Sequence, residues 1–405
     1  MLDLLSSAAI YSIPFLLVLT VVVAIHELGH FLAAKACGVA IDEFSIGFGK
    51  PIVKWRDKSG VEWRVGWIPL GGYVRFSGDS NDASVPDSDD LASLRKEIEV
   101  KLGADQVKRF YHFKPVWQRA VIAAAGPFAN FVLAVLIFAT IFMSVEIVRL
   151  RPIVGSVEPG SAAAAAGFQP GDVIKKANGR AIRDFSEFHM FVALRAGEDV
   201  VIDVERAGEP VRLGATLRRI SEKDGLTGQR TSTGRIGIRP KEDGFYMYRA
   251  ANPIEALDEG VRAVWMRLDT TLTYLGRIFK GRENGDQLSG VIGMANVSGS
   301  LTKQTIAESP TFGAFMTSAL FKLVQLTATL SIGIGFVNLL PVPMLDGGHL
   351  VFYAYEAVAR RPLAAKVQAA GYRVGLALVL GLMLFATWND LQRLDAFRFL
   401  GSLFS

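Results

Sequence analysis

Cysteine is almost absent from this chain, since Cys37 is the only one in 405 residues. A disulfide-stabilised secreted domain is therefore excluded, because a lone cysteine has no partner within the chain. Charged residues are also few, at 20% of the composition, whereas hydrophobic residues make up 50% and the mean hydropathy is +0.30. These values argue against a disordered chain and against one large soluble domain.

The charges are missing from four long stretches in particular. No Asp, Glu, Lys or Arg occurs in residues 4–25, 120–145, 323–345 or 374–389. A helix needs roughly 20 apolar residues to cross the hydrocarbon core of a bilayer, so the first three stretches are long enough. The fourth becomes long enough if residues 367–372 join it and Arg373 extends toward the headgroups. The sequence therefore predicts a polytopic α-helical membrane protein with about four transmembrane helices.

The excess of basic residues favours a membrane topology over nucleic-acid binding. The net charge is +5, but Lys and Arg are interspersed with acidic residues and do not form one patch. Three short segments between apolar stretches are rich in Lys and Arg: residues 50–58, 108–119 and 360–366. Such segments stay on the cytoplasmic side. We therefore expect both termini and residues 146–319 on the opposite, extracytoplasmic side.

These patterns divide the chain into seven predicted parts. The transmembrane helices fall in residues 1–37, 117–145, 319–349 and 350–405, the last with a C-terminal tail. Residues 38–116 form a cytoplasmic region with a membrane-associated β-hairpin, residues 146–220 a small extracytoplasmic α+β domain, and residues 221–318 a linker with an amphipathic helix. In the small domain, short β-rich runs alternate with turn pairs such as Pro170-Gly171 and Asn178-Gly179, and residues 185–194 suit a helix.

The amphipathic helix is predicted from Ala256 to Phe279. Apolar residues recur there at helical spacing: Leu257, Val261, Val264, Trp265, Leu268, Leu272 and Leu275. We interpret this stripe as packing against the neighbouring domain. A location on the membrane surface is the alternative.

The motif with the most distinctive chemistry lies at the end of the first apolar stretch, where the chain reads His26-Glu27-Leu28-Gly29-His30. On a helix, positions i and i+4 share one face, so both imidazoles can bind one tetrahedral Zn²⁺ with Glu27 beside it as a general base. Roughly 0.006 such HExxH patterns are expected by chance in a chain of this composition, which makes coincidence a poor explanation. The alternative is a pair of histidines at a polar helix interface. At membrane depth, however, ionisable groups are costly and favour a shared cation.

A catalytic zinc usually takes three protein ligands, and the candidate for the third is Asp346. It is the first charged residue after the third apolar stretch. Pro341 and Pro343 prevent a regular helix just before it, and irregular backbone at membrane depth is tolerated only against protein or a wet cavity. We expect Asp346 at the same cytoplasmic end as the two histidines. Helix capping is the alternative role for Asp346, and His349 is the alternative ligand.

Three motifs together resemble the site-2 protease family of intramembrane zinc metalloproteases, and the similarity is greatest to its bacterial RseP type. They are HELGH at residues 26–30, AGPFANF at residues 125–131 and NLLPVPMLDGG at residues 338–348. The resemblance implies that His26, His30 and Asp346 hold Zn²⁺, that Glu27 is the general base and that Asn338 handles substrate. It also implies a location in the bacterial inner membrane. It further implies a PDZ-like fold for the small domain, single here where some relatives have two in tandem.

A strand edge suited to an unwound substrate is predicted in residues 61–76. Val61, Trp63, Val65 and Trp67 alternate with polar or small residues, Pro69 and Gly71-Gly72 supply a turn, and Tyr73, Val74 and Phe76 form a second arm. Extended peptides commonly bind by pairing with such an edge. The family has a membrane-dipping β-loop at this place. We therefore expect Trp67, Gly71, Gly72, Tyr73 and Val74 to contact substrate, with a purely structural hairpin as the alternative.

The sequence thus favours an enzyme that cleaves transmembrane segments of single-span membrane proteins, with Zn²⁺ as cofactor. The resemblance implies anti-sigma factors or signal-peptide remnants as substrates, in regulated intramembrane proteolysis. The PDZ-like domain is expected to act as a size filter or to bind a substrate chain end, and we favour the filter. A membrane scaffold with a structural metal site is the alternative function. A cation transporter is disfavoured, because the outer halves of the apolar stretches hold almost no polar groups.

Overall fold

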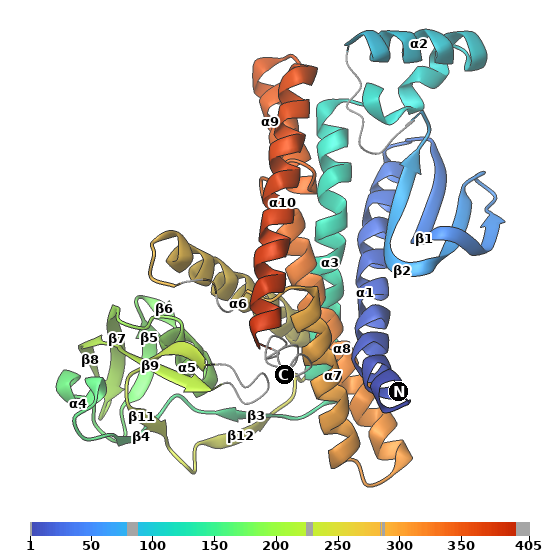
Figure 1. Ribbon diagram of the computed structural model, residues 1–405. Coiled ribbons are helices and arrows are strands. Elements are labelled where there is room, and N and C mark those ends of the chain that lie inside the picture. Colours follow the sequence, from blue (N-terminus) through green and yellow to red (C-terminus); the bar gives the residue numbers. More distant parts are fainter. Residues whose placement is uncertain (1, 79–87, 224–229, 284, 286–287, 394–405) are drawn as a thin grey trace, which may run out of the picture. The chain divides into compact units, whose positions relative to one another are not determined.

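The computed structural model describes residues 2–78, 88–223, 230–283, 285 and 288–393 (Figure 1). The chain forms two compact units. Unit 1 comprises the described residues of 1–137 and 289–405, and unit 2 comprises those of 138–288.

Four helices in the described part of the chain are long and apolar enough to cross a membrane. They are α1 (Leu2–Ala36), α3 (Val116–Ser144), α8 (Phe312–Asn338) and α10 (Ala365–Arg393). They coincide with the four apolar stretches, so their prediction as helices is confirmed. Many of their apolar side chains are exposed, such as Leu17, Phe128 and Leu384, as expected for helices that face lipid.

The helix in the third apolar stretch ends before the stretch itself does. The helix α8 stops at Asn338, and a separate helix, α9 (Asp346–Ala359), begins at Asp346. The part assigned to residues 319–349 therefore contains most of α8, the interruption expected at Pro341 and Pro343, and the start of α9. Pro341 and Pro343 lie in the break, because proline has no N–H to donate and clashes with the preceding helical turn.

Two long bent strands, β1 (Ile41–Arg56) and β2 (Glu62–Phe76), form an antiparallel sheet in unit 1. The first half of β1 lies in the middle: Phe44 pairs with Val74 on one side and with Trp63 on the other. The two predicted arms of residues 61–76 therefore do not pair with each other as a hairpin, and that part of the prediction is wrong. Both arms flank β1 instead.

A buried acid fixes this sheet. Glu43 is only 2% exposed and accepts hydrogen bonds from Tyr73 (2.5 Å) and from Arg64, while Arg75 lies 2.8 Å from its other oxygen. Burial alone would raise the pKa of Glu43, but these hydrogen bonds and the two guanidinium charges lower it below its ordinary value. Because Arg64 and Arg75 come from the two arms of β2, Glu43 joins both arms to the central strand.

The remaining elements of unit 1 are short helices and one longer one. They are α2 (Ser88–Leu102), the 3-10 turns η1 (Ala104–Arg109) and η2 (Tyr111–Phe113), and α7 (Val291–Glu308). The helix α7 packs closely against α1, since a Cβ placed on Gly299 would lie 1.8 Å from the ring of Tyr11. We had assigned residues 291–308 to an extracytoplasmic linker, so this packing was not foreseen.

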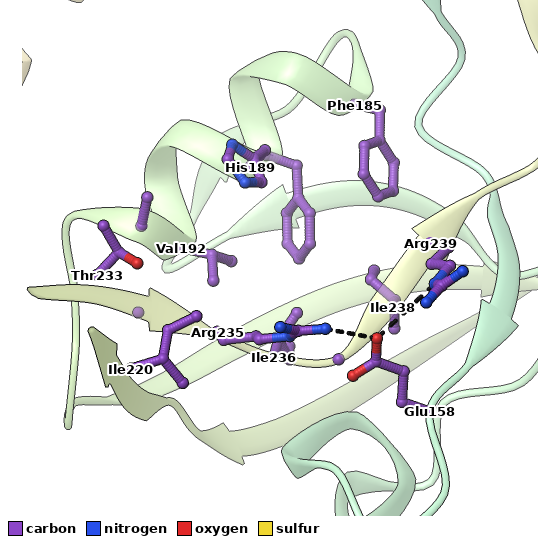
Figure 2. A pocket seen from close by; sticks show the side chains of 14 residues that line it. Glu158, Phe185, His189, Val192, Ile220, Thr233, Arg235, Ile236, Ile238 and Arg239 are labelled. Atoms are coloured by element: carbon purple, nitrogen blue, oxygen red, sulfur yellow. Dashed lines mark hydrogen bonds and ion pairs between the residues drawn. The ribbon is translucent and has the colours of Figure 1, made fainter. Parts of the chain in front are cut away.

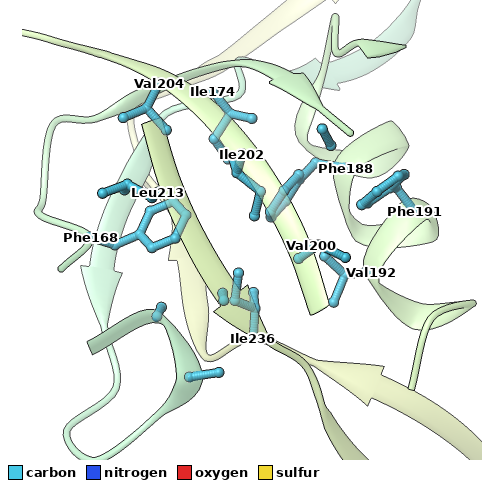
Figure 3. Packing of buried hydrophobic residues seen from close by; sticks show 14 of the residues in the cluster. Phe168, Ile174, Phe188, Phe191, Val192, Val200, Ile202, Val204, Leu213 and Ile236 are labelled. Carbon is cyan, nitrogen blue, oxygen red and sulfur yellow. The ribbon is translucent and has the colours of Figure 1, made fainter. Parts of the chain in front are cut away.

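Unit 2 is built around a four-stranded antiparallel sheet in the order β6-β5-β7-β8. The strands are β5 (Val173–Ala177), β6 (Arg180–Ala181), β7 (Asp199–Arg206) and β8 (Glu209–Thr216). The helices α4 (Ala162–Ala166) and α5 (Phe185–Ala193) belong to the same unit. Alternating residues of β7, such as Val200, Ile202 and Val204, are buried with Phe188 of α5 (Figure 3). The predicted strands and helix of the small domain are confirmed.

The boundary of this small domain is not where we placed it. Ile236 lies in the same core, and β11 (Ile238–Pro240) pairs with β4 (Val154–Val157). Further along the chain, β12 (Phe245–Tyr248) pairs with β3 (Ile147–Leu150). The strands β9 (Arg218–Lys223) and β10 (Arg230–Arg235) form another pair. We therefore define the β domain as residues 147–248, about thirty residues beyond the predicted end at 220, because strands far along the chain complete it.

The predicted amphipathic helix is α6 (Pro253–Phe279) in unit 2. Its apolar stripe is largely exposed, at 65% for Trp265 and 54% for Val261, although Val264 is buried. The polar side contacts the β domain through ion pairs of Glu259, Asp269 and Arg277 with Arg149, Arg180 and Glu198. The prediction that the apolar stripe packs against the β domain is therefore wrong for the exposed residues of the stripe. The membrane-surface location stays a prediction.

Candidate metal centre

The first half of the centre comes from one helix face. His26 and His30 lie one turn apart on α1, and their ring centroids are 4.8 Å apart. The two Nε2 atoms approach to 3.2 Å. His26 is buried at 6% exposure, while Glu27, on the next position of the helix, is half-buried. The helix thus directs two nitrogen ligands to one point and places a carboxylate beside them.

The second half comes from the far end of the chain. One carboxylate oxygen of Asp346 lies 3.2 Å from His26 Nε2, and the other lies 3.5 Å from His30 Nε2. Among the described residues, these three side chains form the one group of three or more His, Cys, Asp or Glu with ligand atoms close enough for a metal ion. The structure therefore brings Asp346 to the histidines, as a shared metal site requires.

The chain between α8 and α9 sets the position of Asp346. Met344 has a φ of +90°, a conformation that costs energy for a residue with a side chain and that clusters at functional sites. The loop folds tightly onto the start of α9, since a Cβ on Gly347 or Gly348 would lie 2.3 Å from a backbone oxygen of the loop. Asp346 is the first helical residue and Leu345 occupies the N-cap position. The alternative of Asp346 as the helix cap is therefore not supported.

The helix α3 packs against the histidine face of α1. The Nδ1 of His30 lies 2.8 Å from the Ile122 carbonyl oxygen, to which it donates when it carries hydrogen. That bond leaves the Nε2 of His30 as the nitrogen with a free lone pair. Close approach depends on glycine: a Cβ on Gly126 would lie 2.3 Å from His30 Nε2, and one on Gly29 would lie 2.4 Å from the Ala125 carbonyl oxygen.

The donor set fits zinc. Zinc binds imidazole nitrogen and carboxylate oxygen at about 2.0–2.2 Å in tetrahedral geometry, so its ligand atoms lie about 3.3 Å from one another. In the structure the two Nε2 atoms are 3.2 Å apart, one Asp346 oxygen is 3.2 Å from His26 Nε2, and the other Asp346 oxygen is 3.5 Å from His30 Nε2, so each pair of side chains approaches this separation. Two histidines and one acid also match the ligand types of catalytic zinc sites, which keep one position open.

Comparison with known proteins gives the family. The sequence pattern of peptidase family M50 matches residues 14–382. This chain belongs to peptidase family M50. Metalloprotease MmpA of Caulobacter vibrioides is 51% identical over 393 residues, which cover 97% of this chain and 98% of that protein. A protein of Agrobacterium fabrum named as a zinc metalloprotease is 40% identical over 387 residues, or 95% of this chain and 96% of its own.

Membership of family M50 establishes the class of enzyme. The protein is a zinc metalloprotease, and its four apolar helices make it an integral membrane protein. A PDZ domain of the SdrC-like protein of Listeria monocytogenes is similar to a part of this chain. The match is 25% identical, covers 22% of this chain and 87% of that domain, and has a TM-score of 0.19.

Of the other residues considered for the M50 site, two lie near the metal-site side chains and one does not. Asn338 ends α8, and its amide nitrogen lies 3.4 Å from His26 Nε2. Gly72 lies beside the catalytic candidate, because a Cβ there would be 3.1 Å from Glu27 Cγ. His349, the alternative ligand, has its Nδ1 3.4 Å from the Tyr372 hydroxyl and is not in the metal-site group.

The residues of β2 that were predicted to contact substrate differ in how exposed their side chains are. A Cβ on Gly71 would lie 2.4 Å from the ring of Phe48, so this glycine allows close packing. The side chains of Tyr73 and Val74 lie on opposite faces of the sheet, where Tyr73 donates to Glu43 and Val74 packs in the cluster around Phe44. Trp67 is 71% exposed and packs at Gly49. Because the side chains of Tyr73 and Val74 already have partners within the protein, a substrate would contact the backbone of these two residues.

Sequence reasoning missed the groups on α3 that contact the histidines. Ile122 contacts His30 through its backbone carbonyl, and because every residue type has one, the sequence does not mark this position. Gly126 and Asn130 were noted only as part of a family motif, although an isolated Asn in an uncharged transmembrane stretch is itself a signal of a specific polar contact.

Replacing Gly126 by Ala is expected to lower proteolytic activity about 100-fold, since a displacement of about 1 Å at a reacting centre costs this much. The new methyl group would lie 2.3 Å from His30 Nε2, so the imidazole must move. Initial rates and bound zinc of the purified variant measure the effect. Gly333→Ala on α8 is the matched control, because a Cβ there meets nothing within 4 Å. Equal activity of both variants would show that the close α1–α3 contact does not position His30.

A separate groove lies in the β domain (Figure 2). Its volume is about 320 Å³, and α5 forms one wall with Phe185, His189 and Val192. The opposite wall is the segment from Thr233 to Arg239. Arg235 and Arg239 both contact Glu158, at 2.7 and 3.7 Å, at one end of the groove. The groove is large enough for a short peptide segment.

Proposed function

We propose that this M50 enzyme is an endopeptidase that cleaves the transmembrane segments of single-span membrane proteins. The observation that carries the proposal is the position of the metal group: His26, Glu27 and His30 lie on a helix apolar enough to span a bilayer, and Asp346 joins them. A protease site on such a helix suits substrates that are themselves in the membrane. Anti-sigma factors and signal-peptide remnants are the substrate types that the family resemblance suggests.

The orientation follows from the basic loops. We infer that residues 50–58, 108–119 and 360–366 face the cytoplasm and that the termini and the β domain lie outside the bacterial inner membrane. The metal centre is then near the cytoplasmic side, because α1 ends at Ala36, soon after His30. A site near this boundary gives water access to the cleavage reaction.

The residues of the centre divide the chemistry. Zinc, when bound at His26, His30 and Asp346, supplies Lewis acidity and lowers the pKa of water. Glu27 accepts a proton from the attacking water and passes it to the leaving amine. A substrate helix hides its carbonyls in internal hydrogen bonds, so it unwinds locally and pairs with β2 near Gly72, which lies beside Glu27.

The β domain filters substrates by size in this proposal. It starts at Ile147, directly after α3 ends at Ser144, so a folded module is tethered at the outer end of a transmembrane helix. A single-span protein with a bulky outer domain is then hindered, whereas a trimmed one is admitted. The groove between α5 and residues 233–239 supports the alternative, capture of the exposed chain end of a trimmed substrate.

The test uses the purified full chain in proteoliposomes with one single-span substrate in two forms, intact and with its outer domain removed. We expect cleavage of the trimmed form only, and loss of this cleavage when a zinc chelator is added.

The variant His189→Arg, at an exposed position that lines the groove, distinguishes the two uses of the β domain. Unchanged cleavage of the trimmed form supports the filter, and its loss supports chain-end capture. Failure to cleave either form with zinc present would contradict the proposed function.

A further inference from the structure

Asn130 is a polar residue enclosed by three apolar helices. It lies on α3, is 0% exposed and belongs to a stretch without charged residues. Its backbone carbonyl accepts a hydrogen bond of 2.8 Å from Ser331 of α8. A Cβ on Gly335, also of α8, would lie 3.3 Å from Asn130 Cβ. The backbone and Cβ of Asn130 therefore lie close against α8, and burying the side-chain amide is costly unless it makes specific hydrogen bonds.

The amide faces His26. Its Nδ2 lies 3.3 Å from His26 Nδ1, and its Oδ1 has no hydrogen-bond partner among the described residues. The oxygen and nitrogen of an amide have nearly the same shape, so rotating the group by 180° exchanges them at no steric cost. The same side chain can thus present either a donor or an acceptor to His26.

These two arrangements correspond to the two tautomers of His26. When Nε2 uses its lone pair for a metal, the hydrogen is on Nδ1, which then needs an acceptor. With the amide rotated, Asn130 Oδ1 supplies that acceptor. When the hydrogen is instead on Nε2, it points to the Asp346 carboxylate 3.2 Å away, and Nδ1 accepts a hydrogen bond from Asn130 Nδ2.

The Nδ1 atom of the second histidine, His30, has a different kind of partner. His30 Nδ1 faces the backbone carbonyl of Ile122, which can only accept. His30 is therefore held in one tautomer, with its Nε2 lone pair directed at the centre. Of the two Nδ1 atoms, that of His26 faces a side chain, so a substitution of Asn130 can remove this partner without changing the backbone.

We propose that Asn130 is a positioning residue that holds His26 in its metal-binding tautomer by accepting the Nδ1 hydrogen on Oδ1. The inference rests on the proposed function in one respect, namely that His26 is a zinc ligand. Partners that orient a metal-binding histidine are typically worth about 10–100-fold in metal affinity. Asn130 therefore acts through His26 and needs no contact with substrate.

The experiment measures the zinc dissociation constant of the purified full chain by competition with a chelator. Asn130→Leu keeps the size of the side chain and removes the acceptor, so zinc should bind about 10–100-fold more weakly. Asn130→Asp supplies an acceptor that cannot act as a donor when ionised, so it should bind zinc about as well as the natural chain. Absorption of the Co²⁺-loaded proteins reports ligand geometry, and we expect an altered spectrum only for Asn130→Leu.

Two controls separate the possible failures. Ser331→Ala removes the contact with the Asn130 carbonyl but leaves the amide and His26 in place, so zinc affinity should not change. His26→Ala should lose zinc, and if it does not, the proposed metal centre itself is wrong.

If His26→Ala loses zinc but Asn130→Leu does not, only the role of Asn130 is overturned. Equal losses in Asn130→Leu and Asn130→Asp would indicate a packing role and overturn it too. If Asn130→Leu does not fold, Asn130→Asp decides: weak zinc binding overturns the proposal.

Discussion

Replacing Glu27 by Gln is expected to lower the rate of peptide-bond cleavage by about 10²–10⁴-fold, the range that a general acid–base catalyst contributes. Glutamine has the same shape as glutamate but cannot accept the proton of the attacking water. Glu27 is not in the group of three metal-binding side chains, so zinc should remain bound. The variant should therefore be an inactive protein with an intact metal site, as shown by cleavage assays beside zinc analysis.

This prediction also distinguishes the enzyme from a membrane scaffold with a structural metal. A structural zinc needs four protein ligands and no neighbouring base. The structure places three candidate ligands together, two imidazoles and one carboxylate, and the carboxylate of Glu27 lies on the neighbouring position of α1. Glu62→Gln is a matched control, because this glutamate lies on β2 and pairs with Arg56 at the surface. Full cleavage by Glu27→Gln would exclude the residue as the base.

Apolar helices were the part of the fold most readily predicted. The stretches at residues 4–25 and 120–145 contain no charged side chain, and a bilayer leaves a chain of that composition little choice other than a helix. The end of α8 was harder, although Pro341 and Pro343 were visible. Prolines show that a helix is interrupted, but the length of the interruption depends on packing, here of Gly347 and Gly348 against the loop.

Strand pairing could not be predicted because it is decided by distant residues. The two arms of β2 look like a hairpin in the sequence, yet the buried Glu43 attracts an arginine from each and places β1 between them. The β domain shows the same limit. Its predicted end at 220 followed local turn signals, whereas Ile236 and the strand at 238–240 return to complete the core.

The candidate site divides in a similar way. The spacing of His26 and His30 fixes their common face, and Asp346 was identifiable because it is the first charge after the third apolar stretch and follows two prolines that interrupt the helix. The partners of the two Nδ1 atoms were not visible in the sequence, because the contacts with the Ile122 carbonyl and the Asn130 amide depend on how α1 and α3 pack. Tautomers are set by neighbours in space, and the neighbours lie about a hundred residues away in the chain.

Replacing Asp346 by Ala is expected to remove zinc and, with it, proteolysis. Loss of a partner that only orients a ligand costs about 10–100-fold in metal affinity, so loss of the ligand itself should cost more than about 100-fold. Only His26 and His30 would remain, and catalytic zinc sites use three protein ligands. The zinc content of the purified protein and its zinc dissociation constant measure the effect.

The control for this substitution lies on the same helix. Glu356 is a second acid of α9, and it pairs with Arg119 of α3 at 2.6 Å, away from the metal-site group. Glu356→Gln weakens the attachment of α9 to α3 but leaves every proposed ligand in place. If zinc is lost in Asp346→Ala and kept in Glu356→Gln, the carboxylate of Asp346 is the group that matters. If Asp346→Ala retains zinc at natural affinity, the meeting of α1 and α9 at this point does not form the metal site, and the proposed mechanism loses its basis.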